Sequence, residues 1–177
     1  MDKNTLLFSK TRDVKSPVRA HATDAGIDFF IPNDLIDTDI YNSYKTTGTV
    51  IHVKWSEDEK HIEKIIVPPH GSVLIPSGIK VIVPEGFALI FFNKSGVATK
   101  KHILRGACVC DQGYFGEILF NMNNVSNEDV ELSTGEKLIQ GVLIPVGSHQ
   151  PVEVNDIMNY TIQSERGEGG FGSSGTK

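Results

Sequence analysis

The chain has 177 residues, a length that suits one domain with a sizeable hydrophobic core. Its composition, 39% hydrophobic and 22% charged, is ordinary for a soluble globular protein. The formal net charge of -5 gives no electrostatic footprint for nucleic acid or for an anionic membrane, so we expect neither as a partner.

Targeting and redox features are few. The N-terminus has no apolar run of the kind found in signal peptides, and GFALIFF at 86–92 is far shorter than the ~20 residues of a membrane helix. Cys108 and Cys110 lack a second Cys or His pair, which favours two buried small side chains in a reducing compartment over zinc ligands. We expect a cytoplasmic protein, or one of the host-cell cytoplasm or nucleus if the chain is viral.

Short runs of β-branched and aromatic residues between Pro and Gly turns predict a chain made mostly of strands. The expected strands lie at 27–31, 49–55 and 61–67, three within 71–92, a hairpin in 106–124 that turns near 111–113, and one at 136–146. The one convincing helix candidate is SGVATKKHIL at 95–104, with Ser95 as its N-cap. Many short strands at close spacing indicate an all-β sandwich or barrel.

Two segments differ in character from the rest. Residues 33–48 are polar and rich in turn formers, and the runs 49–55 and 61–67 alternate around the acidic turn SEDEK. For 33–66 we therefore expect a β-hairpin arm or flap. The region beyond about residue 164 is rich in Gly and Ser and should be mobile in isolation.

The Gly-rich tail RGEGGFGSSG at 166–175 contains G-x-G-x-x-G letter for letter. The dinucleotide interpretation fails, because that motif must follow a strand and open a helix, and only five residues remain. Other local motifs also have plain interpretations. NKSG at 93–96 suits a phosphate but also a capped turn, Asp111 and Asp28 suit turns, and Gln140 is either a satisfied polar residue or a ligand.

The order of these motifs is more specific than any one of them. DAGID, KSG, CDQGYFGE, GEKLIQ and RGEGGFGSSG follow one another from about residue 22 to the C-terminus, and this series resembles the five motifs of the trimeric dUTPase (dUTP pyrophosphatase) family. The resemblance implies an all-β, dUTPase-like jelly-roll or β-clip barrel with one short helix and an inserted β-hairpin arm. It also implies a β domain at 1–164, with the insertion at about 33–66, and a flexible lid arm at 165–177.

The resemblance implies an activity, the hydrolysis of dUTP to dUMP and pyrophosphate, which limits uracil incorporation into DNA and supplies dUMP for dTMP synthesis. Asp111 would activate the water that attacks the α-phosphate. Tyr114 would pack beneath the deoxyribose and exclude a 2′-hydroxyl, and Cys108 would contribute backbone contacts to the uracil. The expected cofactor is Mg²⁺ bridging the phosphates, with no direct protein ligand and with Asp28 acting through water.

The remaining matched residues would bind the substrate, and the family assembles as a homotrimer with shared active sites, in which the lid comes from a different subunit than the hairpin. Arg166 would hold the γ-phosphate and Phe171 would stack on the uracil. The other expected phosphate-binding residues are Lys94, Ser95, Gly96, Gln140, Gly172, Ser173 and Ser174.

Three departures from the family pattern stand out. Lys94 replaces the usual arginine, CVCD replaces aliphatic residues before the aspartate, and very roughly 25 residues around 35–65 have no match. That insertion is a candidate site for a protein partner, and a non-enzymatic regulatory role on the same scaffold is one alternative function. The other is a dCTP deaminase-like enzyme, which the complete tail and the Asp111–Tyr114 pair disfavour.

Overall fold

The computed structural model describes residues 5–147 and 149–160, and the chain divides into two compact units, 1–147 and 148–177. The described residues of the second unit contain a single turn of 3₁₀ helix, η1 (Ile157–Tyr160). The predicted lid arm at 165–177 lies outside the described residues, with Arg166, Phe171, Gly172, Ser173 and Ser174. In the part of the chain that the structure describes, no helix is both long and apolar enough to cross a membrane.

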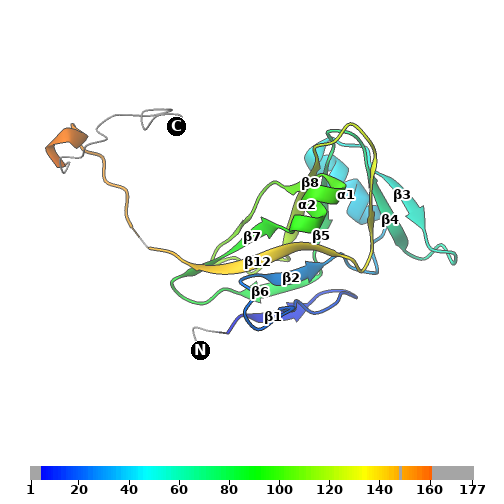
Figure 1. Ribbon diagram of the computed structural model, residues 1–177, viewed down its shortest axis with the longest axis horizontal. Helices are drawn as coiled ribbons and strands as arrows, with labels where there is room; N and C mark the ends of the chain where they lie inside the picture. Colours follow the sequence, from blue (N-terminus) through cyan, green and yellow to red (C-terminus); the bar gives the residue numbers. More distant parts are fainter. Residues whose placement is uncertain (1–4, 148, 161–177) are drawn as a thin grey trace. The chain divides into compact units, whose positions relative to one another are not determined.

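The first unit consists of short strands and two α-helices within residues 5–147 (Figure 1). In chain order these are β1 (Leu7–Lys10), β2 (Ile27–Phe30), α1 (Asp37–Thr47), β3 (His52–Trp55), β4 (Ile62–Val67), β5 (Ser72–Pro76), β6 (Ile79–Ile82), β7 (Phe87–Asn93), α2 (Ser95–Lys101), β8 (Ile103–Arg105), β9 (Val109–Cys110), β10 (Leu119–Asn124), β11 (Val130–Ser133) and β12 (Lys137–Pro145). The prediction of an all-β fold is confirmed.

All the strand pairs are antiparallel. They form a four-stranded sheet in the order β2-β12-β7-β9, two three-stranded sheets, β5-β10-β8 and β11-β4-β3, and the ribbon β1-β6. The helices are peripheral: α1 packs against β5, and α2 packs against β8 (Figure 1). The expected strands at 27–31, at 136–146 and within 71–92 are therefore present.

The core joins two of these sheets through three phenylalanine rings. Phe29 on β2, Phe91 on β7 and Phe120 on β10 meet edge to face, with centroid separations of 5.2, 5.6 and 6.1 Å. Such pairs contribute about 0.5–1.5 kcal/mol each beyond the burial of their area. Gly141 on β12 permits this packing, because a Cβ there would lie 3.0 Å from the Phe29 ring.

The inserted segment contains a helix that the sequence analysis missed, so the prediction of one short helix is wrong. The start of α1 is fixed by the Asp39 carboxylate, which accepts the Ile36 N–H at 3.0 Å. Its end is fixed by Gly48, which has φ +72° and donates to the Tyr44 carbonyl at 2.8 Å. Ser43 attaches the helix to β5, because its buried hydroxyl accepts the Leu74 N–H at 2.9 Å.

The predicted hairpin at 49–67 is confirmed as β3 paired with β4. It is not a free arm, however, since β4 also pairs with β11. Ile62, Ile65 and Val67 on β4 are completely buried and belong to the hydrophobic core. The second strand of the hairpin is therefore an integral part of the first unit.

Two further local predictions are wrong. In 106–124 the strand β9 pairs with β7, whereas β10 pairs with β5 and β8, so β9 and β10 do not form a hairpin with each other. Strand β9 instead lies at the edge of the four-stranded sheet, where it pairs with β7. The N-cap of α2 is Lys94 rather than Ser95, without a side-chain capping bond, and the helix ends before His102, which has φ +52°.

Candidate functional site

A pocket of about 190 Å³ opens beside β9 and the turn that follows it. Cys108, Asp111 and Tyr114 line it, with the Phe91 ring from β7 on another side. Asp111 and Tyr114 belong to one turn, in which the Tyr114 N–H donates to the Asp111 carbonyl at 3.1 Å. The structure thus places three sequence-predicted site residues around one concave surface.

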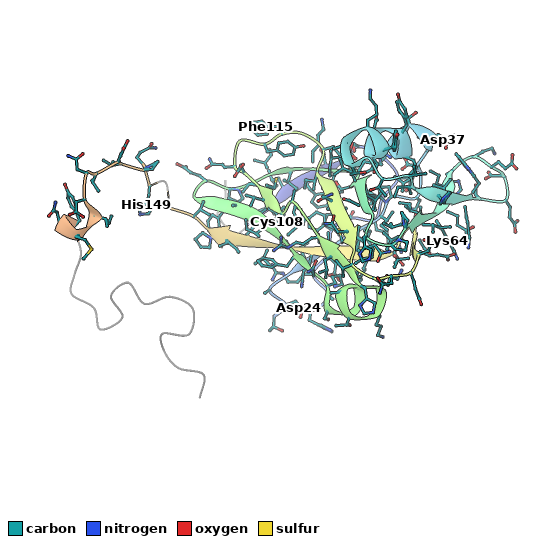
Figure 2. The ribbon with its side chains drawn as sticks, turned by 90° about the horizontal axis from the view of Figure 1, so that it is seen from above. Asp24, Asp37, Lys64, Cys108, Phe115 and His149 are labelled. Atoms are coloured by element: carbon teal, nitrogen blue, oxygen red, sulfur yellow. The ribbon has the colours of Figure 1, made fainter. Side chains whose placement is uncertain are left out.

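Strand pairing fixes the cysteine side of this pocket. The Cys108 carbonyl accepts the Phe91 N–H at 2.8 Å, which attaches this segment to β7. Figure 2 labels Cys108 within the first unit. Both thiols are free, and that of Cys110 is buried. Burial, with a smaller contribution from the Asp111 charge, raises the pKa of the Cys110 thiol, so it stays protonated at neutral pH. Cys110 therefore acts as a small apolar side chain in the pocket wall.

Tyr114 is held by contacts within its own turn. Its hydroxyl donates to the Glu117 carbonyl at 2.7 Å. A Cβ at Gly116 would lie 2.5 Å from that hydroxyl, so the glycine leaves room for the ring to fold back. Tyr114 is 43% exposed and lines the pocket.

Asn121 supports the segment that leads into the pocket, and the sequence analysis did not identify it. Its carbonyl accepts the Gly106 N–H at 2.7 Å, and its side chain donates to the Ser72 hydroxyl at 2.9 Å. A Cβ at Gly106 would overlap the Asn121 side chain. The GAC sequence before β9 was the available signal, because it contains a glycine where two backbones approach closely.

A second group of polar residues gathers around Asp28 on β2. Asp28 is 4% exposed and forms ion pairs with Lys94 and with Lys137, the latter at 2.8 Å. Burial alone would raise the pKa of Asp28, but the hydrogen bonds from Lys137 and Lys94 outweigh it and hold the pKa below its usual range. Asp28 is therefore a carboxylate at neutral pH, with each oxygen bound by one ammonium group.

Gln140 lies beside this group, opposite Asp28 in the register of β12 and β2. Its amide donates to the Asn93 carbonyl at 2.9 Å, and a Cβ at Gly26 would overlap its amide oxygen. One of the two amide N–H groups of Gln140 is thus bound within the chain. Ser95 and Gly96, the first two residues of α2, are exposed.

Strand β7 connects the two groups. Asn93, at its end, accepts from Gln140 and also accepts the Arg105 N–H at 2.7 Å through its side chain. Within the described part of one protomer, no hydrogen bond or ion pair directly joins Asp28, Lys94 or Gln140 to Asp111 or Tyr114. Likewise, residues 5–147 and 149–160 hold no group of three His, Cys, Asp or Glu side chains suited to a metal ion.

Solved structures to which this chain is similar include dUTPases. The dUTPase of Staphylococcus bacteriophage 80alpha with dUPNHPP has a TM-score of 0.71 and 24% identity, covering 97% of this chain and 99% of that chain. A mutant dUTPase from phage phi11 of S. aureus, described with a structural Mg(II) ion, has a TM-score of 0.63 and 21% identity over 86% of this chain and 98% of that chain. These likenesses confirm the predicted dUTPase-type β fold.

Sequence relatives agree with the fold. The deoxyuridine 5'-triphosphate nucleotidohydrolase of Hydrogenobaculum sp. is 34% identical over 115 residues, which are 64% of this chain and 77% of that protein. That of Candida albicans is 36% identical over 113 residues, 64% of this chain and 70% of that protein. The dUTPase family model matches residues 58–175, a region that contains the last four motifs but begins after DAGID. The chain belongs to the dUTPase family.

Proposed function

We propose that this protein hydrolyses dUTP to dUMP and pyrophosphate. The observation that carries the proposal is the placement of Asp111 and Tyr114 in one turn beside a pocket of about 190 Å³, in a chain of the dUTPase family. Asp111 is exposed, so a water molecule can reach its carboxylate, which orients that water and accepts its proton as the nucleophile forms.

The sugar and base ends of the substrate belong in the same pocket. The Tyr114 ring, fixed through its hydroxyl, forms a rigid wall that leaves no room for a 2′-hydroxyl. Backbone groups of the segment at Cys108 face the uracil. Phe171 of the lid arm stacks over the base, which excludes water from the site.

The phosphate end belongs near Lys94, Ser95, Gly96 and Gln140. The ion pair with Asp28 holds the ammonium of Lys94, the residue before α2, although a lysine lacks the two-pronged fit of an arginine to phosphate oxygens. Arg166, Gly172, Ser173 and Ser174 of the lid complete this end.

The residues present fit a Mg²⁺ ion that is held by phosphate oxygens and water. Such an ion needs few protein ligands. The two lysines already occupy the Asp28 oxygens, so Asp28 would act on the ion at a distance, through water. When bound, Mg²⁺ neutralises charge on the triphosphate.

A homotrimer with shared sites completes the proposal. No hydrogen bond or ion pair joins the Asp111 and Asp28 groups within the described residues, as expected if each meets its counterpart from a neighbouring copy. Exposed apolar side chains of Leu7, Phe8 and Ile82 line a second pocket of about 260 Å³ with Phe115, which Figure 2 shows at the periphery of the first unit. That surface suits contact between copies.

Pyrophosphate release from dUTP, compared with dTTP, dCTP and UTP, tests the activity. Asp111→Asn should bind dUTP but lose about 10²–10⁴-fold in turnover, the usual contribution of a general base; wild-type turnover would exclude Asp111 as the base. Ammonia release from dCTP would instead support the deaminase alternative. Truncation after Glu165 should leave a folded protein with little activity. Normal activity of the truncated protein would exclude a role of the lid arm in catalysis.

A second candidate function is a protein contact on the inserted segment. Exposed Tyr41, Tyr44 and Val50 surround an open pocket of about 420 Å³ on α1 and the residues after it. Replacing Tyr41 and Tyr44 by serine should leave pyrophosphate release unchanged if this surface serves a partner rather than catalysis. A loss of turnover in the folded variant would show that this surface contributes to catalysis and is not reserved for a partner.

A further inference from the structure

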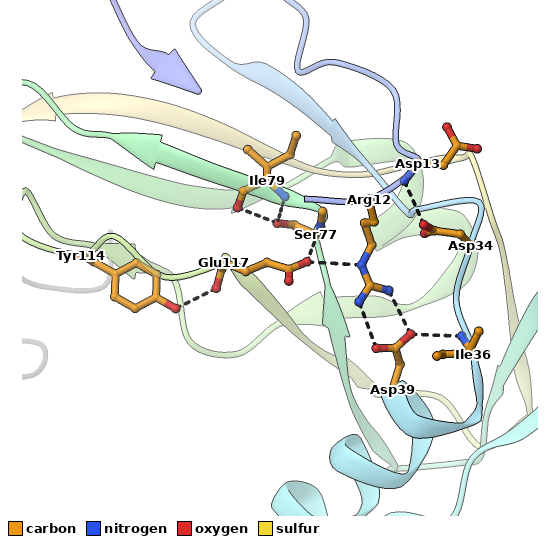
Figure 3. A network of polar contacts seen from close by, with 10 residues as sticks. Arg12, Asp13, Asp34, Ile36, Asp39, Ser77, Ile79, Tyr114 and Glu117 are labelled. Atoms are coloured by element: carbon orange, nitrogen blue, oxygen red, sulfur yellow. Dashed lines mark hydrogen bonds and ion pairs between the residues drawn. The ribbon is translucent and has the colours of Figure 1, made fainter. Parts of the chain in front are cut away.

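A polar network at the side of the first unit connects the inserted helix to the Tyr114 turn (Figure 3). Arg12, between β1 and β2, binds both carboxylate oxygens of Asp39 on α1, at 2.9 and 3.2 Å. Its Nε lies 3.6 Å from the Glu117 carboxylate, an ion pair rather than a short hydrogen bond. The three side chains are 21%, 12% and 24% exposed, so the charges are partly shielded from water.

Glu117 is the point at which this network meets the pocket turn. Its carbonyl accepts the Tyr114 hydroxyl at 2.7 Å, and its carboxylate accepts the Gly78 N–H at 2.7 Å. The next residue, Ile118, donates to the Ile79 carbonyl at 3.0 Å. The position of the Tyr114 hydroxyl therefore depends on where Glu117 is held against the β5–β6 connection.

Arg12 is itself fixed from both sides. The N–H of Thr11 donates to the Gly78 carbonyl at 2.8 Å, and the N–H of Asp13 donates to the Asp34 carboxylate at 2.9 Å. A Cβ at Gly78, which has φ +70°, would lie 2.6 Å from the Arg12 stem, so the stem packs directly on that glycine. The guanidinium thus has one well-defined location between α1 and the pocket turn.

The charges around Arg12 do not balance without it. Asp39 and Glu117 share one guanidinium, and Asp34 adds a third carboxylate nearby. Burial lowers the pKa of Arg12, but the hydrogen bond and charge of Asp39 outweigh it and the net pKa is raised. Removing this cation leaves carboxylates that repel one another and takes from Glu117 its ion pair, so the Glu117 carboxylate is then held by its hydrogen bond from the Gly78 N–H.

We propose that Arg12 is a positioning residue for Tyr114: through Glu117 it fixes the ring that excludes a 2′-hydroxyl, and through Asp39 it ties that ring to the inserted helix α1. The inference rests on the proposed function, because it assigns Arg12 to sugar selection. The segment at 33–66 thereby gains a role inside its own protomer. It supports the specificity of the pocket from a distance.

The test compares kcat/KM for dUTP and UTP in wild type, Arg12→Met, Arg12→Lys and Tyr114→Phe. Methionine keeps the apolar stem and removes the charge. Because a small misplacement of a positioning group can cost up to about 10²-fold, Arg12→Met should lower the dUTP:UTP selectivity ratio by about tenfold. The selectivity ratio of Arg12→Lys should lie between those of wild type and Arg12→Met, since an ammonium keeps the charge but cannot reproduce the forked contact of the guanidinium.

Two comparisons separate positioning from general stability. In the Tyr114→Phe background, which lacks the hydroxyl bond, Arg12→Met should change selectivity no further, giving a non-additive cycle. The control is Lys10→Met, which removes an exposed cation two residues away and should leave the selectivity ratio unchanged. A purely structural Arg12 would instead lower both substrates' kcat/KM equally and additively with Tyr114→Phe, and that result would overturn the proposal.

Glu117→Gln covers the case in which Arg12→Met does not fold. Its amide oxygen still accepts the Gly78 N–H while the charge partner of Arg12 is lost, so selectivity should fall in the same direction. An unchanged ratio in folded Glu117→Gln would also overturn the proposal. A wild-type protein that does not hydrolyse dUTP contradicts the proposed function. If the wild type is active but the Arg12 and Glu117 variants keep its dUTP:UTP selectivity ratio, only the role of Arg12 is contradicted.

Discussion

The buried Asp28 carboxylate should make the stability of this protein depend on pH in a way that one substitution removes. Asp28→Asn keeps the shape of the side chain but leaves Lys94 and Lys137 without their counter-charge and places an amide N–H₂ group against an ammonium group. We therefore expect the variant to fold and to be less stable than wild type at neutral pH.

The magnitude follows from the exposure of the three side chains. Removing one partner of a fully buried pair costs about 3–5 kcal/mol. Here the Asp28 side chain is 6% exposed, but those of Lys94 and Lys137 are 26% and 44% exposed and can regain water. Partial hydration of the two lysines reduces the expected loss to about 1–3 kcal/mol.

The sign of the pH dependence follows from the lowered pKa of Asp28 in the folded protein. A depressed carboxyl pKa contributes stability that is present above the unfolded-state pKa of about 3.9 and is lost as the pH falls through the folded-state pKa. Asparagine does not titrate. The wild type should therefore exceed the variant in unfolding free energy by the whole contribution of the Asp28 charge at pH 7, and by less at about pH 3.

Urea unfolding followed by far-UV circular dichroism measures this difference, at one protein concentration because assembly shifts apparent stability. Asp24→Asn is the matched control, since among the described residues the Asp24 carboxylate accepts the His21 N–H, and an amide oxygen can accept it in the same way. Equal destabilisation by Asp28→Asn at pH 7 and pH 3, or none at pH 7, would refute the reasoning.

Two other substitutions and one alkylation experiment give clear expectations. Gly26→Ala should displace the Gln140 side chain and weaken binding of a non-hydrolysable dUTP analogue measured by calorimetry, whereas unchanged affinity would remove Gln140 from the phosphate site. Glu131, whose pKa is lowered to about 2 by hydrogen bonds from two lysines, should contribute stability above pH ~4.5 that is lost toward pH 2, so the melting-temperature gap between wild type and Glu131→Gln should close there. With its raised pKa, Cys110 should resist alkylation at pH 8 longer than Cys108, and equal rates would contradict its burial.

The residue placements that sequence can predict are those carried by a short continuous segment. Asp111 and Tyr114 are three residues apart, and one turn brings them to the same pocket. Strands such as β7 and β12 were predictable because their β-branched and aromatic residues leave few alternatives. Sequence spacing alone was sufficient for these features.

Other features depend on contacts between distant segments. The helix α1 is mostly polar, and besides Ile40, which packs against the core, it is held by the Asp39 contact at its start, by Gly48 at its end and by the buried Ser43 hydroxyl. A hydrophobic period reports none of these three polar features. Lys137 reaches Asp28 only because of the register of β12 against β2. The pairing of β9 with β7 was likewise decided by tertiary structure.

The sequence contains a single tryptophan, Trp55, and it lies at the end of β3, 36% exposed, in the inserted segment. The aromatic residues of the pocket are Phe91 and Tyr114. Indole fluorescence therefore reports on the hairpin and circular dichroism on the sheets as a whole. A fluorescence change that precedes loss of the dichroism signal would identify the hairpin as a separately opening unit, without any added label.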